Sequence, residues 1–176
     1  MDNTIRMPHL YLDMDGVQAD LFHALAQLHK VPSWDHIEDK EKATLRVKLQ
    51  GPDVVYNFFK DLQPLPGGLR IIKWLRDNEI PFTVLTAPFQ IETDACIQGK
   101  KDWLDIHNPG TSDSCIFDRN KYNYALTDGH PNVLVDDYEV YLGPFANHGG
   151  IAVKHHDSTT DRTINILSMI YAQWLK

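Results

Sequence analysis

Residues 9–16, HLYLDMDG, join a short apolar run to two aspartates two positions apart and to a glycine. This pattern is typical of a buried β-strand that ends abruptly. Because side chains alternate along a strand, Asp13 and Asp15 leave it on the same face. Sheets of the α/β class bind their ligands beyond the carboxyl ends of the strands. The two carboxylates therefore predict an active site, either as ligands of a divalent cation or as nucleophile and proton carrier.

Strand and helix patterns alternate along the rest of the chain, apart from a charged, helical stretch without a strand signal at 31–64. Alternation of this kind predicts an α/β fold with a Rossmann-like, doubly wound parallel sheet that is covered on both faces. Right-handed crossovers then bring the carboxyl ends of all strands to one edge. We expect strands at 8–14, 81–87, 114–117, 132–135 and 150–153, and helices at 18–30, 68–78, 92–105 and 159–175.

Length and composition narrow the class of protein. The 176 residues suit one domain with a small insertion, and 43% hydrophobic with 23% charged residues is typical of a globular protein. A net charge of −7 disfavours duplex nucleic acid as a partner, because binding by counterion release needs a basic surface. A small anionic molecule remains a suitable partner. The sequence is compatible with a homodimer but does not fix the oligomeric state.

Cysteine usage and hydropathy indicate the compartment. Cys96 and Cys115 are the two cysteines and form no CxxC motif, which argues against a disulfide framework and a cysteine-rich zinc site. No apolar stretch reaches the length needed to cross a bilayer, and the first ten residues contain no signal-peptide core. We therefore expect a protein of the reducing cytoplasm with no membrane partner.

Three further features fall on the predicted active-site edge. Asp136 and Asp137 follow a second buried strand, and two acidic pairs at two strand ends favour metal binding over surface turns. Thr86 ends another strand, where a hydroxyl beside free backbone N–H groups suits a phosphate oxygen. Lys121 lies in a loop near these acids, where a cation would be electrostatically useful.

Other known motifs explain these residues less well. An EF-hand that begins at Asp13 would have Val17 at position 5 and Ala24 at position 12, so it fails. A Walker loop is absent because neither Gly-Gly pair leads to a GK[ST] sequence. The pair His155-His156 is interpreted as solvated. The aromatic residues in or near the insertion are expected to pack its helices, with one or two available to stack on a base: Trp34, Tyr56, Phe58 and Phe59.

In order along the chain, DMDGVQAD (13–20), TAP (86–88), Lys121 and VDD (135–137) resemble the four motifs of the haloacid-dehalogenase-like phosphohydrolases. This resemblance extends over nearly the whole chain. The sequence further resembles the 5'(3')-deoxyribonucleotidase group, which has a DMDGVLAD start, a PLPG phrase after paired aromatic residues, a T-[SA]-P motif, a TRDK motif and a final pair of aspartates. The matching stretches are FFKDLQPLPG (58–67), TAP, DRNK (118–121) and LVDD (134–137).

The resemblance implies a division of the chain and a mechanism. Residues 1–17 and 65–176 would form the haloacid-dehalogenase-like core, and residues 18–64 a small helical cap. Asp13 would attack phosphorus to form an aspartyl-phosphate, and Asp15 would transfer the protons. The resemblance also implies that Asp13, the Asp15 carbonyl and Asp137 would bind Mg²⁺, with Asp136 bound to it through a water. Thr86 and the Ala87 N–H would bind the phosphate oxygens, and Lys121 would neutralise charge in the transition state.

The implied activity is Mg²⁺-dependent dephosphorylation of nucleoside monophosphates, with 5'(3')-deoxyribonucleotides as the favoured substrates and Trp34, Tyr56 and Phe58 beside the base. Alternatives are a phosphatase for nucleic-acid 3'-ends or other small phosphoesters, and a nucleotide-binding module without turnover. The sequence departs from the group at Gln18, where an apolar residue is usual, and at Leu21, where an aromatic residue can occur.

Overall fold

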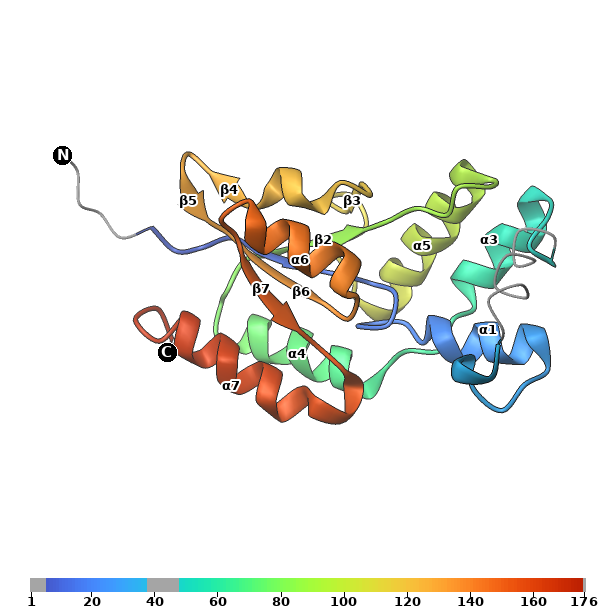
Figure 1. Cartoon of the computed structure of the whole chain (residues 1–176), viewed down its shortest axis with the longest axis horizontal. Coiled ribbons are helices and arrows are strands. Elements are labelled where there is room, and N and C mark those ends of the chain that lie inside the picture. Colours follow the sequence, from blue (N-terminus) through green and yellow to red (C-terminus); the bar gives the residue numbers. More distant parts are fainter. Residues whose placement is uncertain (1–5, 38–47, 176) are drawn as a thin grey trace.

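A five-stranded parallel sheet with the order β3-β2-β1-β6-β7 forms the centre of the molecule (Figure 1). This computed structural model describes residues 6–37 and 48–175. The chain winds outward from β1 to β2 and β3, then returns to the other side of β1 for β6 and β7, so the predicted doubly wound α/β fold is confirmed. The strands are β1 (Leu10–Leu12), β2 (Phe82–Thr86), β3 (Ile116–Phe117), β6 (Val133–Asp136) and β7 (Ile151–Lys154).

The first strand lies between β2 and β6, which explains its apolar sequence. All three of its residues are buried, and Leu12 is in register with Val84 on one side and Val135 on the other. Asp13 comes directly after Leu12, and Asp136 directly after Val135, so these two aspartates lie side by side at the carboxyl edge of the sheet. The winding direction also reverses between β1 and β6, and that position is where open α/β sheets bind ligands.

Helices cover both faces of the sheet. Leu10 and Leu12 point to the face covered by α4 (Pro66–Asp77) and α7 (Thr160–Ile170), whereas Tyr11 points to the face covered by α6 (Glu139–Asn147). Successive side chains of β1 therefore pack against helices on opposite faces of the sheet, as the two-residue period of a strand requires. Both faces of β1 are thus removed from water, as expected for the middle strand of a parallel sheet.

Between β1 and α4, the described part of the inserted segment 18–64 forms α1 (Leu21–His29), the short 3₁₀ helix η1 (Trp34–His36) and α3 (Pro52–Lys60). The segment begins and ends at one place, because the Asp20 N–H donates to the Gln63 carbonyl and the Leu65 N–H donates to the Gln18 carbonyl. Figure 1 shows α1 and α3 beyond the carboxyl ends of the strands, where α3 packs against α5 (Thr93–His107).

The first turn of α4 closely approaches the turn that follows β1. A Cβ atom at Gly68 would lie 2.1 Å from the Val17 carbonyl oxygen and 2.8 Å from the Gln18 Cα atom. Only glycine permits this approach. The glycine that follows the PLPG phrase therefore has a packing role, since it lets α4 lie against the turn that follows the two aspartates.

The structure differs from the sequence prediction at several places. The last helix ends at Ile170 instead of residue 175, because Tyr171 packs into the core and donates to the Pro8 carbonyl. An unpredicted hairpin pairs β4 (Leu126–Thr127) with β5 (His130–Pro131). Its turn is Asp128-Gly129, with positive φ at both residues, the Asp-Gly signal of a tight hairpin.

Two other sequence interpretations can be compared with the structure. His155 is buried, and its Nδ1 is 3.0 Å from the Thr163 hydroxyl, so the interpretation of His155-His156 as a solvated pair was wrong for the first residue. Cys96 and Cys115 are both free thiols. Within residues 6–37 and 48–175, none of the helices has the length and hydropathy that crossing a bilayer would require.

Candidate active site

Four carboxylates gather at the carboxyl ends of β1 and β6: Asp13, Asp15, Asp136 and Asp137. Carboxylate oxygens of Asp13, Asp136 and Asp137 lie within 4.8 Å of one another, and Asp13 and Asp136 are buried. Like charges held this close and out of water repel strongly. The cluster therefore requires cations, and the protein supplies two of them.

The first cation is Lys121, in the 3₁₀ helix η2 (Lys121–Tyr124). Its Nζ donates to Asp136 Oδ2 at 2.6 Å and forms an ion pair with Asp13 Oδ1 at 2.7 Å. Burial acts to lower the pKa of Lys121, but these two carboxylates act in the opposite direction and the net shift is upward. The sequence predicted this lysine at the mouth of the site, and the structure places it inside the carboxylate cluster.

The second cation is Lys100, in α5, which the sequence analysis did not single out. Its Nζ donates to Asp15 Oδ2 at 2.6 Å, to the Thr86 hydroxyl at 2.7 Å and to the Ala87 carbonyl at 2.9 Å, and the side chain is fully buried. It shares a buried helix face with Cys96, Trp103 and Leu104. A lysine on the apolar stripe of a predicted helix was the signal that could have revealed it.

The glycine after the aspartates has a steric role. Gly16 has a φ of +76°, a conformation that other residues rarely adopt. A Cβ atom there would also lie 2.4 Å from Asp137 Oδ2 and 2.9 Å from the Phe22 ring. Gly16 thus lets the chain turn away from β1 and leaves room for the Asp137 carboxylate.

Burial raises the pKa of Asp137 to about 8, and the Asp13 carboxylate adds to this rise. The same two causes raise the pKa of Asp136 to about 7, against the opposing effect of Lys121.

The net charge of the cluster bears on which ion it could bind. With two ammonium groups against four carboxylates, the fully ionised cluster has an excess of two negative charges. Asp15 Oδ1 is also buried without a hydrogen-bond partner. Oxygen ligands and uncompensated negative charge fit a hard divalent cation such as Mg²⁺.

Comparisons with known proteins agree with this geometry at the level of the fold. No family model matches the sequence, and no curated protein matches it. Among solved structures, a HAD family hydrolase from Deinococcus radiodurans R1, with bound phosphate and sodium, superposes with a TM-score of 0.60 at 12% identity. The alignment covers 97% of this chain and 99% of that one. The chain has the haloacid-dehalogenase-like fold.

A HAD hydrolase of family IA, variant 3, from Entamoeba histolytica HM-1:IMSS was also found, with 15% identity and a TM-score of 0.46. That alignment covers 93% of this chain and 89% of the other.

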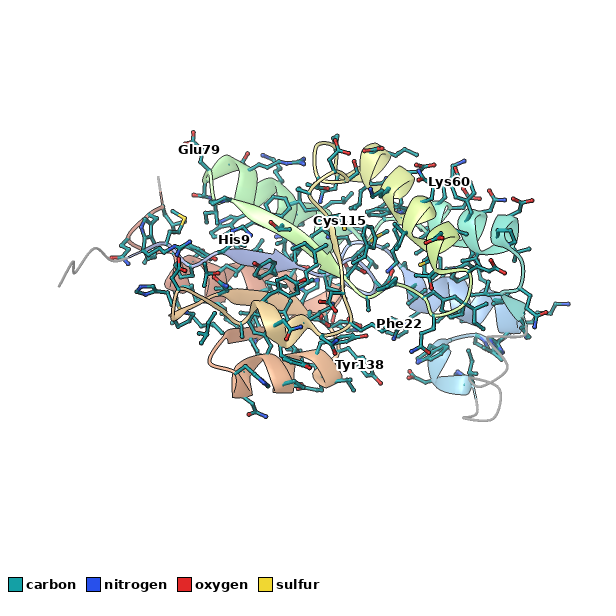
Figure 2. The ribbon with its side chains drawn as sticks, turned by 90° about the horizontal axis from the view of Figure 1, so that it is seen from above. His9, Phe22, Lys60, Glu79, Cys115 and Tyr138 are labelled. Atoms are coloured by element: carbon teal, nitrogen blue, oxygen red, sulfur yellow. The ribbon has the colours of Figure 1, made fainter. Side chains whose placement is uncertain are left out.

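A cavity of about 300 Å³ opens above the carboxylates of the haloacid-dehalogenase-like fold. Its charged floor contains Asp13, Asp15, Asp137, Arg119 and Lys121. Aliphatic and aromatic side chains from the inserted segment and from the loop after β2 form an apolar wall of the cavity: Leu21, Phe22, Leu25, Trp34, Leu49, Phe58, Phe59, Pro88 and Phe89. Phe22 of α1 and Tyr138, the residue before α6, line the cavity from different elements and lie in the middle of the view in Figure 2.

Most of the residues predicted from the sequence meet at this cavity. Trp34, Phe58 and Ala87 line it together with Lys121 and three of the four acids, whereas Asp136 is buried and does not line it. Tyr56 does not, because it belongs to the contact between α3 and α5, where its hydroxyl donates to Asp102 at 2.6 Å. Thr86 is fully buried and is held by Lys100 instead of lining the cavity.

Proposed function

We propose that this protein is a Mg²⁺-dependent phosphatase that acts on nucleoside monophosphates through an aspartyl-phosphate. The observation that supports this most strongly is the pairing of two carboxylates with two buried lysines at the end of β1: Lys121 beside Asp13, and Lys100 beside Asp15. The two aspartates thereby have different electrostatic surroundings, as nucleophilic and proton-transferring groups need. The Deinococcus hydrolase of the same fold holds phosphate.

In this proposal, Asp13 attacks the phosphorus atom, a bond forms between its carboxylate oxygen and phosphorus, and the ester P–O bond breaks. Asp15 gives its proton to the departing alkoxide. Burial raises the pKa of Asp15 against the opposing effect of Lys100, which favours a protonated group at the start. Asp15 then takes a proton from the water that attacks the aspartyl-phosphate, so that phosphate leaves and Asp13 is restored.

The cation would be held by the Asp13 and Asp137 carboxylates and the Asp15 backbone carbonyl, with Asp136 behind a water. Bound there, Mg²⁺ would neutralise charge on a phosphate oxygen. Asp136 is already oriented for a supporting role, because its Oδ2 accepts from Lys121 and its Oδ1 accepts from the Tyr138 N–H at 2.9 Å. Lys121 would neutralise charge on the transferred group.

For the substrate, the cavity offers charged groups that suit a phosphate and flat apolar surfaces that suit a base. Trp34 and Phe58 line the apolar wall, where a base could stack. We propose that the described parts of the segment 18–64, residues 18–37 and 48–64, belong to a cap that covers the reacting groups and excludes water. The preference for 5'(3')-deoxyribonucleotides rests on the sequence resemblance.

The apolar wall also supports a second candidate function. Among the described residues, the uncharged part of the cavity lining consists mainly of hydrocarbon side chains, which suits an aryl phosphate as well as a nucleotide. A panel of dUMP, dTMP, UMP, ribose 5-phosphate and p-nitrophenyl phosphate, assayed by phosphate release with Mg²⁺, separates these functions. Faster turnover of the nucleotides supports a nucleotidase, and turnover of p-nitrophenyl phosphate alone supports an aryl phosphatase. Equal turnover of ribose 5-phosphate supports a general phosphatase, and no turnover supports a binding module.

A further inference from the structure

Gln18 joins the carbonyl group of Asp13 to two other elements of the fold. The Gln18 side chain is fully buried, and its Nε2 donates to the Asp13 carbonyl oxygen at 2.8 Å. Its Oε1 accepts from Asn108 Nδ2 at 2.9 Å, and Asn108 Oδ1 accepts from an Arg76 guanidinium nitrogen at 2.7 Å. A continuous set of side-chain hydrogen bonds therefore runs from the last turn of α4, through the end of α5, to the strand end that carries Asp13.

The chemistry at this position requires an amide. The Asp13 carbonyl can only accept a hydrogen bond, and Asn108 Nδ2 can only donate one, so the bridging side chain must carry a donor and an acceptor at the same distance from its Cα atom. A buried amide without partners would be costly, and here both of its ends are satisfied. The apolar side chains of Leu or Met could fill this space, but neither carries a donor for the Asp13 carbonyl, and the Met sulfur is only a weak acceptor for Asn108.

Gln18 also lies where the inserted segment meets the core. Its N–H donates to the Met14 carbonyl, and its own carbonyl accepts from the Leu65 N–H. The Gly16 N–H donates to the Ala19 carbonyl within the same turn. The side chain of Gln18 thus ties the turn after β1 back to the residue that begins it.

We propose that Gln18 is a positioning residue for Asp13, which fixes the peptide group of Asp13 and so directs its carboxylate at the phosphorus atom. The proposal rests on the proposed function for its catalytic consequence. Its structural part, the fixed turn 13–19, can be tested without turnover. A displacement of about 1 Å at a reacting group can lower a rate about a hundredfold.

The catalytic test compares Gln18→Met, which keeps length and volume but has no amide, with the wild type in steady-state kinetics. We expect kcat to fall about ten- to a hundredfold with KM nearly unchanged, because the substrate still meets the same cavity. The matched control is Asn132→Leu. Asn132 is also buried, and its amide donates to the Tyr124 carbonyl and the Thr127 hydroxyl at the opposite end of the sheet. This control should lower Tm and leave kcat unchanged.

A double-mutant cycle tests the connection to Asn108. If Asn108 acts through Gln18, Asn108→Leu should lower kcat by a smaller factor than Gln18→Met, and the double variant should be no slower than Gln18→Met alone. If the kcat of the double variant instead fell by the product of the two single factors, Asn108 would not act through Gln18.

Amide hydrogen exchange of the substrate-free protein supplies a readout that does not depend on activity. Gln18→Met should increase exchange at the amides of residues 16–19, and Asn132→Leu should not. Unchanged exchange in this turn, or a kcat that follows Tm equally in both variants, would overturn the proposal. A wild type without turnover would refute the proposed phosphatase, and the exchange measurement would still decide whether Gln18 fixes the turn.

Discussion

Replacing Lys100 by Met should separate the two chemical steps. The substitution keeps the length of the side chain but leaves Asp15 Oδ2 without the ammonium that now lies 2.6 Å away. Loss of this cation, in a site where burial already raises the pKa of Asp15, should raise that pKa further and hold the group protonated. A protonated Asp15 still donates to the leaving alkoxide but no longer accepts a proton from water, so the aspartyl-phosphate should accumulate.

Stability should change in a pH-dependent way. Removing one partner of a buried ion pair costs about 3–5 kcal/mol. Proton uptake by Asp15 limits this loss, so we expect about 3 kcal/mol, or a Tm lower by about 6–12 °C for a chain of this size. The raised pKa of Asp15 in the variant favours its protonated form. The decrease in the free energy of unfolding should therefore be small in acid and should grow as pH rises through the folded-state pKa of Asp15.

The assay is rapid-quench kinetics with p-nitrophenyl phosphate, accompanied by thermal unfolding at two pH values. Lys100→Met should show a burst of p-nitrophenol followed by a slow steady state. The control is Lys101→Met, which removes the same charge from the next residue of α5 and should behave as the wild type. Identical kinetics and Tm values for the two variants would refute the role of Lys100.

Three further predictions concern the metal cluster, the turn and the apolar wall. Because the pKa values of Asp136 and Asp137 are raised to about 7 and about 8, their contribution to the stability of the metal-free protein falls as pH rises toward 8. The Mg²⁺-induced rise in Tm should therefore be larger at pH 9 than at pH 6, and an equal rise at both would contradict this site. Gly16→Ala should abolish turnover, since its Cβ would displace the Asp137 carboxylate; full activity would contradict the described turn. Phe58→Ala should raise KM for dUMP about tenfold, whereas Tyr56→Phe should leave it unchanged; the reverse order would contradict the cavity wall.

Much of the fold could be predicted because local patterns determined it. The buried run before Asp13 and Asp15 has the length and composition of a middle strand, and the second acidic pair follows a strand in register with the first. The end of the last helix was less predictable, because it depends on the distant contact between Tyr171 and Pro8. The hairpin around Asp128-Gly129 carried a recognisable local signal but has strands of two residues each.

The site shows the same division between local and distant information. Motif order placed Asp13 and Lys121 together, yet the partner of Asp15 is Lys100, 85 positions along the chain, and no local pattern pairs them. Tyr56 illustrates the opposite error. Its helix contributes Phe58 to the cavity, but helical geometry turns Tyr56 toward α5 and Asp102.

The central claim is that Asp13 is the nucleophile, and acid-quenched wild-type protein with substrate and Mg²⁺ tests it most directly. We expect mass spectrometry to find one phosphoryl group on the peptide that contains Asp13. Asp13→Asn should carry none and should turn over p-nitrophenyl phosphate about 10⁴-fold more slowly or worse, with the fold intact by circular dichroism. Near-wild-type turnover by Asp13→Asn, or a phosphoryl group on another residue, would contradict the account.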